Sequence, residues 1–375
     1  MYPHQAERLT EILDRGGLDV LLATSPANVA YITGYQASSA SLWRRREFGI
    51  FTRAGTAFVG NQHDVMDEGV EVDHVVGLAQ SGQAGDDAST WGTRGPGEAI
   101  VAALARLGVR SGKVGIDESH LTYGEWQHLV ERLSPFEVGP GAAQLAQARR
   151  VKGPYEIECL GRALHIAEEA LDVVIQTVDR GMTEREAADL ITTEIVKREG
   201  WPHPPVVAMG GRTAMLAPRP TAYALRSGQF VRFEVGCAYK GYCSRVARTA
   251  VLGPPAPPSE EIYRGVQARL EAIIDAVGLD TAVGNVSDAA RQAARSHSPD
   301  AARDFVGCGI GLEVREAPDL ATATETSLEL GEVLVIELSH REVGSFGMSV
   351  QDTVLVTTAG ARVLNRSHHG LVVLE

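Results

Sequence analysis

The chain has 375 residues, of which 44% are hydrophobic and 22% are charged, with a formal net charge of −13 and a pI near 5.4. This size allows two domains around large cores, and the composition is that of an ordinary globular protein. The acidic balance argues against a nucleic-acid partner, and no apolar run approaches the ~20 residues that span a bilayer, so we expect a cytoplasmic protein without a membrane partner.

The first half of the chain alternates helical and strand patterns, which predicts a compact α/β domain. Helices are expected at 4–16, 26–33, 97–108 and 122–133, and strands at 19–24, 47–52, 56–60, 72–77 and 113–117. The strands at 47–52 and 56–60 predict a hairpin. The Gly/Ser/Asp-rich stretch 80–97 predicts an exposed loop.

The second half predicts helices with one apolar face. Residues 154–178 carry apolar side chains at steps of three and four, as in a long helix. Thr183, with Glu186 three positions later, forms a capping-box pattern for a second helix that ends near Gly200. Two more helices are expected near 262–278 and 285–296, after a proline-rich link. Four cysteines, without CxxC spacing, suggest reduced thiols.

Two similar hairpins follow these helix pairs, at 225–252 and 328–357. A leucine, a glycine and a glutamate of the first hairpin recur at one constant offset in the second. Helix, helix and hairpin therefore occur twice, which predicts a pseudo-twofold internal repeat. Glu234 and Glu337 each lie in the middle of an apolar strand, where a carboxylate is unfavourable unless it is paired or coordinated. We expect both to face a shared site.

Several segments, in order, resemble the pita-bread family of creatinase, prolidase, aminopeptidase P and methionine aminopeptidase. They are SPANVAYITGY (25–35), PPVVAMGGRTAM (204–215), the first hairpin, GCGIGLEVREAP (307–318) and VQDTVLVTTAGARVLN (350–365). The resemblance implies an α/β N-terminal domain over 1–148 and an α+β pita-bread domain over 149–375. It also implies a homodimer in which the N-terminal domain of one subunit lies near the site of the other.

The resemblance also places a two-metal centre in this chain, but most of its ligands are replaced. Relatives use two Asp, one His and two Glu, and the matching positions here are Glu234, Arg245, Cys308, Glu337 and Gln351. Two carboxylates and a guanidinium cannot neutralise two divalent ions, so we expect no metal and no other cofactor. A single ion held by Glu234, Glu337 and the Cys308 thiolate is the less favoured alternative.

Loss of the ligands does not imply loss of catalysis, because creatinase is a metal-free member of the family. Its catalytic histidine falls at Ala217 here, so its own reaction is not implied. We expect a metal-independent hydrolase that cleaves a C–N bond of a small polar metabolite. The alternatives are an inactive pseudo-peptidase that binds a ligand or partner, and, least favoured, an Xaa-Pro metallopeptidase.

Four residues are candidates for catalysis. Glu234 and Glu337 would transfer protons, and Arg245 would anchor or polarise the substrate. Glu316 matches a family position near the substrate. The structural alternatives are an Arg245 that bridges both glutamates and a Glu316 that pairs with its neighbour Arg315 or makes a helix-end contact.

The candidates for substrate binding are Cys308, Gln351, His340, Arg44 and Arg46. Cys308 lies between glycines, where a buried thiol is commonly inert packing, and as a nucleophile it would need a depressed pKa. His340 is one of the histidines close to the expected site, although a lone loop histidine is commonly just solvated. Arg44 and Arg46 belong to a basic run that either binds a substrate carboxylate or is a solvated charged surface.

Overall fold

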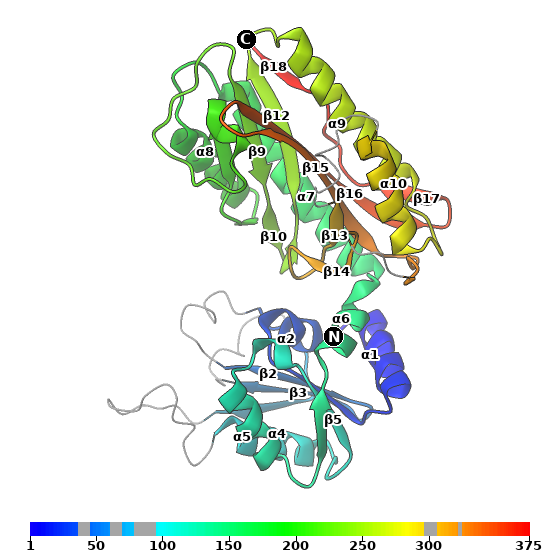
Figure 1. Ribbon diagram of the computed structural model, residues 1–375. Coiled ribbons are helices and arrows are strands. Elements are labelled where there is room, and N and C mark those ends of the chain that lie inside the picture. Colours follow the sequence, from blue (N-terminus) through cyan, green and yellow to red (C-terminus); the bar gives the residue numbers. More distant parts are fainter. Residues whose placement is uncertain (37–45, 61–69, 79–94, 296–305, 322–324) are drawn as a thin grey trace, which may run out of the picture. The chain divides into compact units, whose positions relative to one another are not determined.

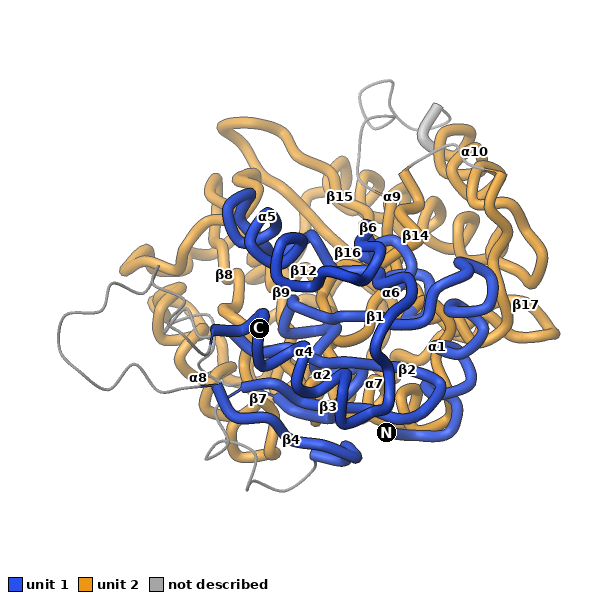
Figure 2. The backbone as a smooth tube through the Cα atoms, turned by 90° about the horizontal axis from the view of Figure 1, so that it is seen from below, with its two compact units in different colours: residues 1–149 blue, residues 150–375 orange. Residues whose placement is uncertain are grey.

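A computed structural model describes residues 1–36, 46–60, 70–78, 95–295, 306–321 and 325–375. The chain forms two compact units, Met1–Arg149 and Arg150–Glu375, which Figure 2 shows in different colours. Within the described ranges, no helix is long and apolar enough to cross a membrane.

The N-terminal unit is built on a six-stranded sheet in the order β4-β3-β2-β1-β5-β6. Its strands are β1 (Val20–Ala23), β2 (Phe48–Thr52), β3 (Gly55–Gly60), β4 (His74–Gly77), β5 (Lys113–Ile116) and β6 (Glu137–Pro140). Its helices are α1 (Pro3–Gly16), α2 (Pro26–Thr33), α4 (Pro96–Arg106), the 3-10 turn η2 (Glu118–His120), α5 (Tyr123–Arg132) and α6 (Ala142–Arg150), the last of which ends at the boundary between the units. The sequence patterns located all of these except β6, η2 and α6.

A buried carboxylate joins α2 to the sheet of this unit. Asp117, directly after β5, accepts hydrogen bonds of 2.6 Å from Ser25 Oγ and from Asn28 Nδ2 at the start of α2. These donors lower the pKa of Asp117 against the opposing effect of its burial. At the other end, α2 stops where Gly34 adopts a left-handed φ of 74°, a conformation that glycine reaches without a steric penalty.

The C-terminal unit is built on a large sheet in the order β14-β13-β15-β16-β12-β9-β8, to which β17 and β18 add at β16 and β12. Its strands are β8 (Val206–Met209), β9 (Phe230–Val235), β12 (Val246–Leu252), β13 (Gly307–Gly309), β14 (Glu316–Asp319), β15 (Val333–Glu342), β16 (Phe346–Thr357), β17 (Gly360–Val363) and β18 (Val372–Leu374). The helices are α7 (Pro154–Thr177), α8 (Glu184–Lys197), the 3-10 turn η3 (Gly210–Ala214), α9 (Pro257–Asp275) and α10 (Val283–Arg295).

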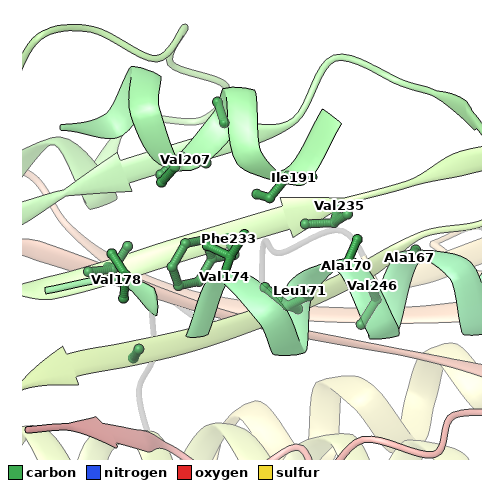
Figure 3. Close-up of a cluster of buried hydrophobic side chains, with 14 of the residues drawn as sticks. Ala167, Ala170, Leu171, Val174, Val178, Ile191, Val207, Phe233, Val235 and Val246 are labelled. Carbon is green, nitrogen blue, oxygen red and sulfur yellow. The ribbon is translucent and has the colours of Figure 1, made fainter. Parts of the chain in front are cut away.

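Helices cover one face of this sheet. In Figure 3, Leu171 and Val174 of α7 and Ile191 of α8 meet Phe233 of β9 and Val246 of β12. Burying one such side chain contributes about 1.5–3 kcal/mol to stability. A second cluster joins α9 and α10 to β15 and β16 (Figure 1). The repeated helix pair followed by a strand pair confirms the predicted internal repeat.

The first hairpin is more elaborate than the simple turn that the sequence suggested. Between β9 and β12 the chain forms β10 (Cys237–Tyr239) and β11 (Tyr242–Cys243), which leave the large sheet. Together with β7 (Trp201–Pro202) they make a separate three-stranded sheet. The connecting segment had an available strand partner in β7, which a local turn pattern does not reveal.

Candidate active site

One register row of the large sheet brings the two glutamates to the same face. Across four adjacent strands, Glu234 is paired with Ala247, Ala247 with Gln351, and Gln351 with Glu337. Residues directly opposite one another in paired strands project from the same side. The odd-numbered residues of β9, such as Phe233, project to the helix-covered side, so Glu234 and Glu337 project to the opposite one.

This side, which we call the polar face, carries the strand residues Arg232, Glu234, Glu337, Ser339, Arg341, Ser349, Gln351 and Thr353. We include in it Arg245, which directly precedes β12 and whose side chain reaches Glu337. Arg245 Nη2 donates a hydrogen bond of 2.6 Å to Glu337 Oε2, and the two side chains are 22% and 15% exposed. The other glutamate has a different arginine as its donor. The bridge of Arg245 to both glutamates, considered from the sequence, is therefore not the arrangement found.

The donor to Glu234 is Arg232, two residues earlier on β9. Its Nη1 hydrogen-bonds Glu234 Oε1, and its Nη2 donates to the carbonyl oxygens of Met215 and Leu216. Arg232 is fully buried, and burial lowers the pKa of its guanidinium. Sequence analysis missed this residue, although strand alternation in FVRFEV puts Arg232 and Glu234 on one face.

Glu234 is electrostatically suited to proton transfer. Burial raises the pKa of its carboxyl group, and the nearby charge of Glu337 raises it further. Arg232, Arg245 and Arg341 act in the opposite direction, with Arg232 the strongest of them. A carboxylate with a raised pKa is a stronger base at neutral pH than an ordinary one.

Several polar atoms of this face have no hydrogen-bond partner among the described residues although they are buried. They are Gln351 Nε2, Arg341 Nε, Arg232 Nε, Ser349 Oγ and Thr353 Oγ1. Arg341 uses its Nη1 to donate to Ser339 Oγ at 2.8 Å. Unpaired polar atoms are unusual in a folded interior and point to a site that is completed by a ligand or by water.

Cys308 lies beside this face but does not have the character of a nucleophile. It pairs with Val335 on β15, and its side chain is 1% exposed. Burial raises the pKa of its thiol, an effect that Arg245 only partly offsets. The thiol is therefore protonated at neutral pH, which favours the packing role.

Glu316 forms a buried ion pair, and its partner is not the neighbouring arginine that the sequence suggested. Lys152 Nζ lies 3.1 Å from Glu316 Oε2, and the side chains are 1% and 4% exposed. Arg315 instead approaches Asp319 at 3.6 Å. Gly311 makes room for the carboxylate, since a Cβ there would lie 2.5 Å from Glu316 Oε2. This geometry favours a structural role.

The remaining candidates do not join the polar face within the described residues. His340 pairs with Met348 on the alternate side of β15 from Glu337, and its ring lies 5.7 Å from that of Phe346. Arg46 makes a bidentate pair with Glu125 in the N-terminal unit, at 2.7 and 2.8 Å. Arg44 lies outside the described residues.

The donors of the polar face do not fit a pair of metal ions. Both carboxylates already accept from guanidinium groups, Arg245 occupies a position expected for a ligand, and the Cys308 thiol is protonated. Nowhere in the described ranges do three or more His, Cys, Asp and Glu side chains cluster in a way that could hold a metal ion. Stable binding of two divalent ions normally needs several anionic ligands.

Comparison with known proteins identifies the family. Residues 158–358 match the model of metallopeptidase family M24, and residues 5–151 match that of the creatinase/prolidase N-terminal domain. The chain is 25% identical to the uncharacterized peptidase YqhT of Bacillus subtilis, over 98% of this chain and 99% of that protein.

Two solved structures have the same fold. The Xaa-Pro dipeptidase of Bacillus anthracis is 23% identical with a TM-score of 0.82, covering 99% of both chains. The X-Pro aminopeptidase of Thermotoga maritima is 18% identical with a TM-score of 0.82, over 98% of this chain and 99% of that one. The chain therefore belongs to metallopeptidase family M24, in its pita-bread creatinase and prolidase branch.

Proposed function

We propose that this chain hydrolyses a C–N bond of a small polar molecule without the metal pair of its relatives. The observation that carries this proposal is that each glutamate of the register row has its own arginine, Arg232 for Glu234 and Arg245 for Glu337. The guanidinium groups supply positive charge at a place where the family resemblance predicts metal ions. Membership of a peptidase family supports hydrolase activity, whereas metal independence is the new element.

Three residues of the polar face have different roles in the proposed reaction. Glu234, as the base, takes a proton from water while the water oxygen bonds to the carbon of the C–N bond. Arg245 anchors the substrate, and its fixed positive charge stabilises the negative charge that develops at the attacked group. Protonated Glu234 then passes its proton to the leaving nitrogen as the C–N bond breaks. Glu337 orients Arg245 through their hydrogen bond.

The activity can be tested without knowing the substrate. Purified protein, dialysed against EDTA, is incubated with a metabolite extract, and the consumed species are found by mass spectrometry. The inactive reference is the Glu234→Gln/Glu337→Gln double variant. The matched control is Arg291→Met, a change of a half-exposed residue on α10. We expect the wild type and Arg291→Met to consume a metabolite by cleaving one of its C–N bonds. The double variant should leave the same metabolite intact.

Two other outcomes would reject parts of the proposal. If consumption requires added Mn²⁺, Co²⁺ or Zn²⁺, the metal-independent mechanism is wrong and the metallopeptidase alternative holds. If the wild type and the double variant leave identical extracts with and without metals, the pseudo-peptidase alternative holds.

We also propose that the chain is a cytoplasmic homodimer, with domains at 1–148 and 149–375. The family resemblance supports the dimer and its composite site. Light scattering of the purified protein at several concentrations tests it, and a monomer at all of them would contradict it.

A further inference from the structure

The polar face has more positive than negative charge. It holds three guanidinium groups, from Arg232, Arg245 and Arg341, and two carboxylates, from Glu234 and Glu337. These groups are close enough to influence one another, since the pKa of Glu234 responds to all four others. The neighbouring pair of Lys152 and Glu316 balances itself. One positive charge therefore remains uncompensated within this face, in a chain whose formal net charge is −13.

The unpaired atoms of this face are chiefly donors. Gln351 Nε2 and Arg341 Nε are buried N–H groups without an acceptor among the described residues. Gln351 is 1% exposed and stands in register between Ala247 and Glu337, in the centre of the row. A buried donor without an acceptor destabilises the fold, so its presence at a site indicates an acceptor from outside the described protein, either on a ligand or in a water that a ligand can displace.

Arg245 is the cation that solvent reaches. Its side chain is 22% exposed, and its hydrogen bond to Glu337 is made through Nη2. A guanidinium group carries five N–H donors in a planar fork that matches two oxygens of one carboxylate. Ala247 lies between Glu234 and Gln351 in the row, and its side chain is a single methyl group. Only the longer side chains around it can therefore extend over the centre of the face.

We infer that the polar face binds a small molecule through a single carboxylate group, with Arg245 as the main contact beside Gln351 and Arg341. The inference rests on the proposed function, because it names the substrate class of the same site. A monoanion cancels the one surplus charge. A phosphate dianion would leave a negative charge next to Glu234 and Glu337, which disfavours it.

Calorimetric titration with chosen probes tests the charge requirement. The probes are acetate, N-acetylglycine and N-acetylglycylglycine as monocarboxylates, N-acetylglycinamide as the neutral counterpart, and inorganic phosphate. All titrations are made well above neutral pH, where phosphate is the dianion. We expect at least one monocarboxylate to bind saturably with one site per chain. The neutral amide and phosphate should bind at least about tenfold more weakly, because each lacks the charge match.

Substitutions locate the binding. Gln351→Met and Arg341→Met should each weaken monocarboxylate binding by about tenfold, the effect of losing one donor to a charged acceptor. Gln351→Met is nearly isosteric and removes a donor that has no partner in the described protein, so it should unfold at the same or a higher urea concentration than the wild type. A loss of binding in this variant is then not a loss of folding. Arg291→Met is the control and should bind as the wild type does.

The inference is overturned by equal binding of the neutral amide, by tighter binding of phosphate, by unchanged binding in both variants, or by no binding of any monocarboxylate. Its failure is distinguishable from failure of the proposed function. Saturable carboxylate binding by a protein that consumes nothing from the extract rejects the hydrolase and keeps this inference. If the protein instead consumes a neutral or cationic metabolite and binds no monocarboxylate, the hydrolase is kept and this inference is rejected.

Discussion

Arg245, directly before β12, and Glu337 on β15 are joined by a hydrogen bond of 2.6 Å. The pair places a fixed cation against a carboxylate that would otherwise be available to a metal ion. A site of this kind should be selective for an organic anion and unattractive to divalent cations.

Replacing that cation should restore affinity for metals. In Arg245→Asp, three carboxylates instead of two face the centre of the row, so we expect Mn²⁺ to bind at least about tenfold more tightly than to the wild type. Calorimetry measures this, and Arg245→Asn, which removes the charge without adding a ligand carboxylate, should gain less. Stoichiometric, tight binding of two Mn²⁺ ions by the wild type would contradict our account of the site.

Arg232 should set the pH at which Glu234 becomes active. A general base works when deprotonated, so kcat/KM should rise with pH through the raised pKa of Glu234. Arg232 lowers that pKa, so Arg232→Met should move this acid limb to higher pH, whereas Arg232→Lys should keep it near the wild-type position. The measurement is a pH profile on the substrate identified from the extract.

The buried position of Arg232 calls for a stability control in that experiment. Breaking a buried ion pair costs about 3–5 kcal/mol, so the folded fraction of each variant is first measured by urea unfolding. An acid limb that stays in place in folded Arg232→Met would show that Arg232 does not tune Glu234.

The ion pair of Lys152 and Glu316 should contribute to the free energy of unfolding. Lys152→Met leaves a buried carboxylate without its cation and should lower the free energy of unfolding by about 3–5 kcal/mol. Adding Glu316→Leu removes the stranded charge and should recover much of the loss. Urea unfolding of the single and double variants gives the coupling energy, and an additive result would argue against the pair.

The start of α8 provides a further test, away from the site. Thr183 accepts from Glu186 N, and the Glu186 carboxylate accepts from Thr183 N at 2.8 Å. Thr183→Ala should therefore lower the free energy of unfolding by about 1 kcal/mol. The matched control is Thr193→Ala in the interior of the same helix, which should be neutral or slightly stabilising. Equal effects at both positions would contradict the capping argument.

His369 should make stability depend on pH. Asp352, whose Oδ2 lies 3.0 Å from His369 Nδ1, raises the pKa of the imidazole above its ordinary value in the folded protein. The stabilisation is complete below the unfolded pKa and is lost as pH rises through the folded pKa. Urea unfolding between about pH 5 and about pH 9 should show this decline in the wild type, and a flatter curve in His369→Gln. His120→Gln, an exposed change, should retain the wild-type slope.

Much of the fold was predictable because its signals are local or periodic. The apolar stripe of 154–178 predicted α7, the Thr183 and Glu186 pattern predicted the start of α8, and both features are found. The repeated position of Glu234 and Glu337 predicted that they share a face, because the two hairpins are copies of one design. The family resemblance added the identity of that fold.

The partners of the site residues were less predictable because they depend on tertiary distances. Lys152 and Glu316 are separated by 164 residues, and nothing local distinguishes Lys152 from Arg315 as the partner. The choice of Arg232 for Glu234, and of Arg245 for Glu337, depends on how far each guanidinium reaches across the sheet. Strand alternation limits the candidates to one face but does not select among them.

Gln351 and Asp352 are neighbours in the chain whose side chains leave opposite faces of β16. Gln351 stands beside Glu337, while Asp352 accepts a hydrogen bond of 2.9 Å from buried Arg248 on the other side. Inserting or deleting one residue in β16 would exchange the faces of these two side chains. Asp352 would then point to the polar face, and buried Arg248 would lose its carboxylate partner. Evolution can therefore change the chemistry of this site by replacing side chains, while the length of the chain through β16 is held constant by an ion pair on the reverse of the sheet.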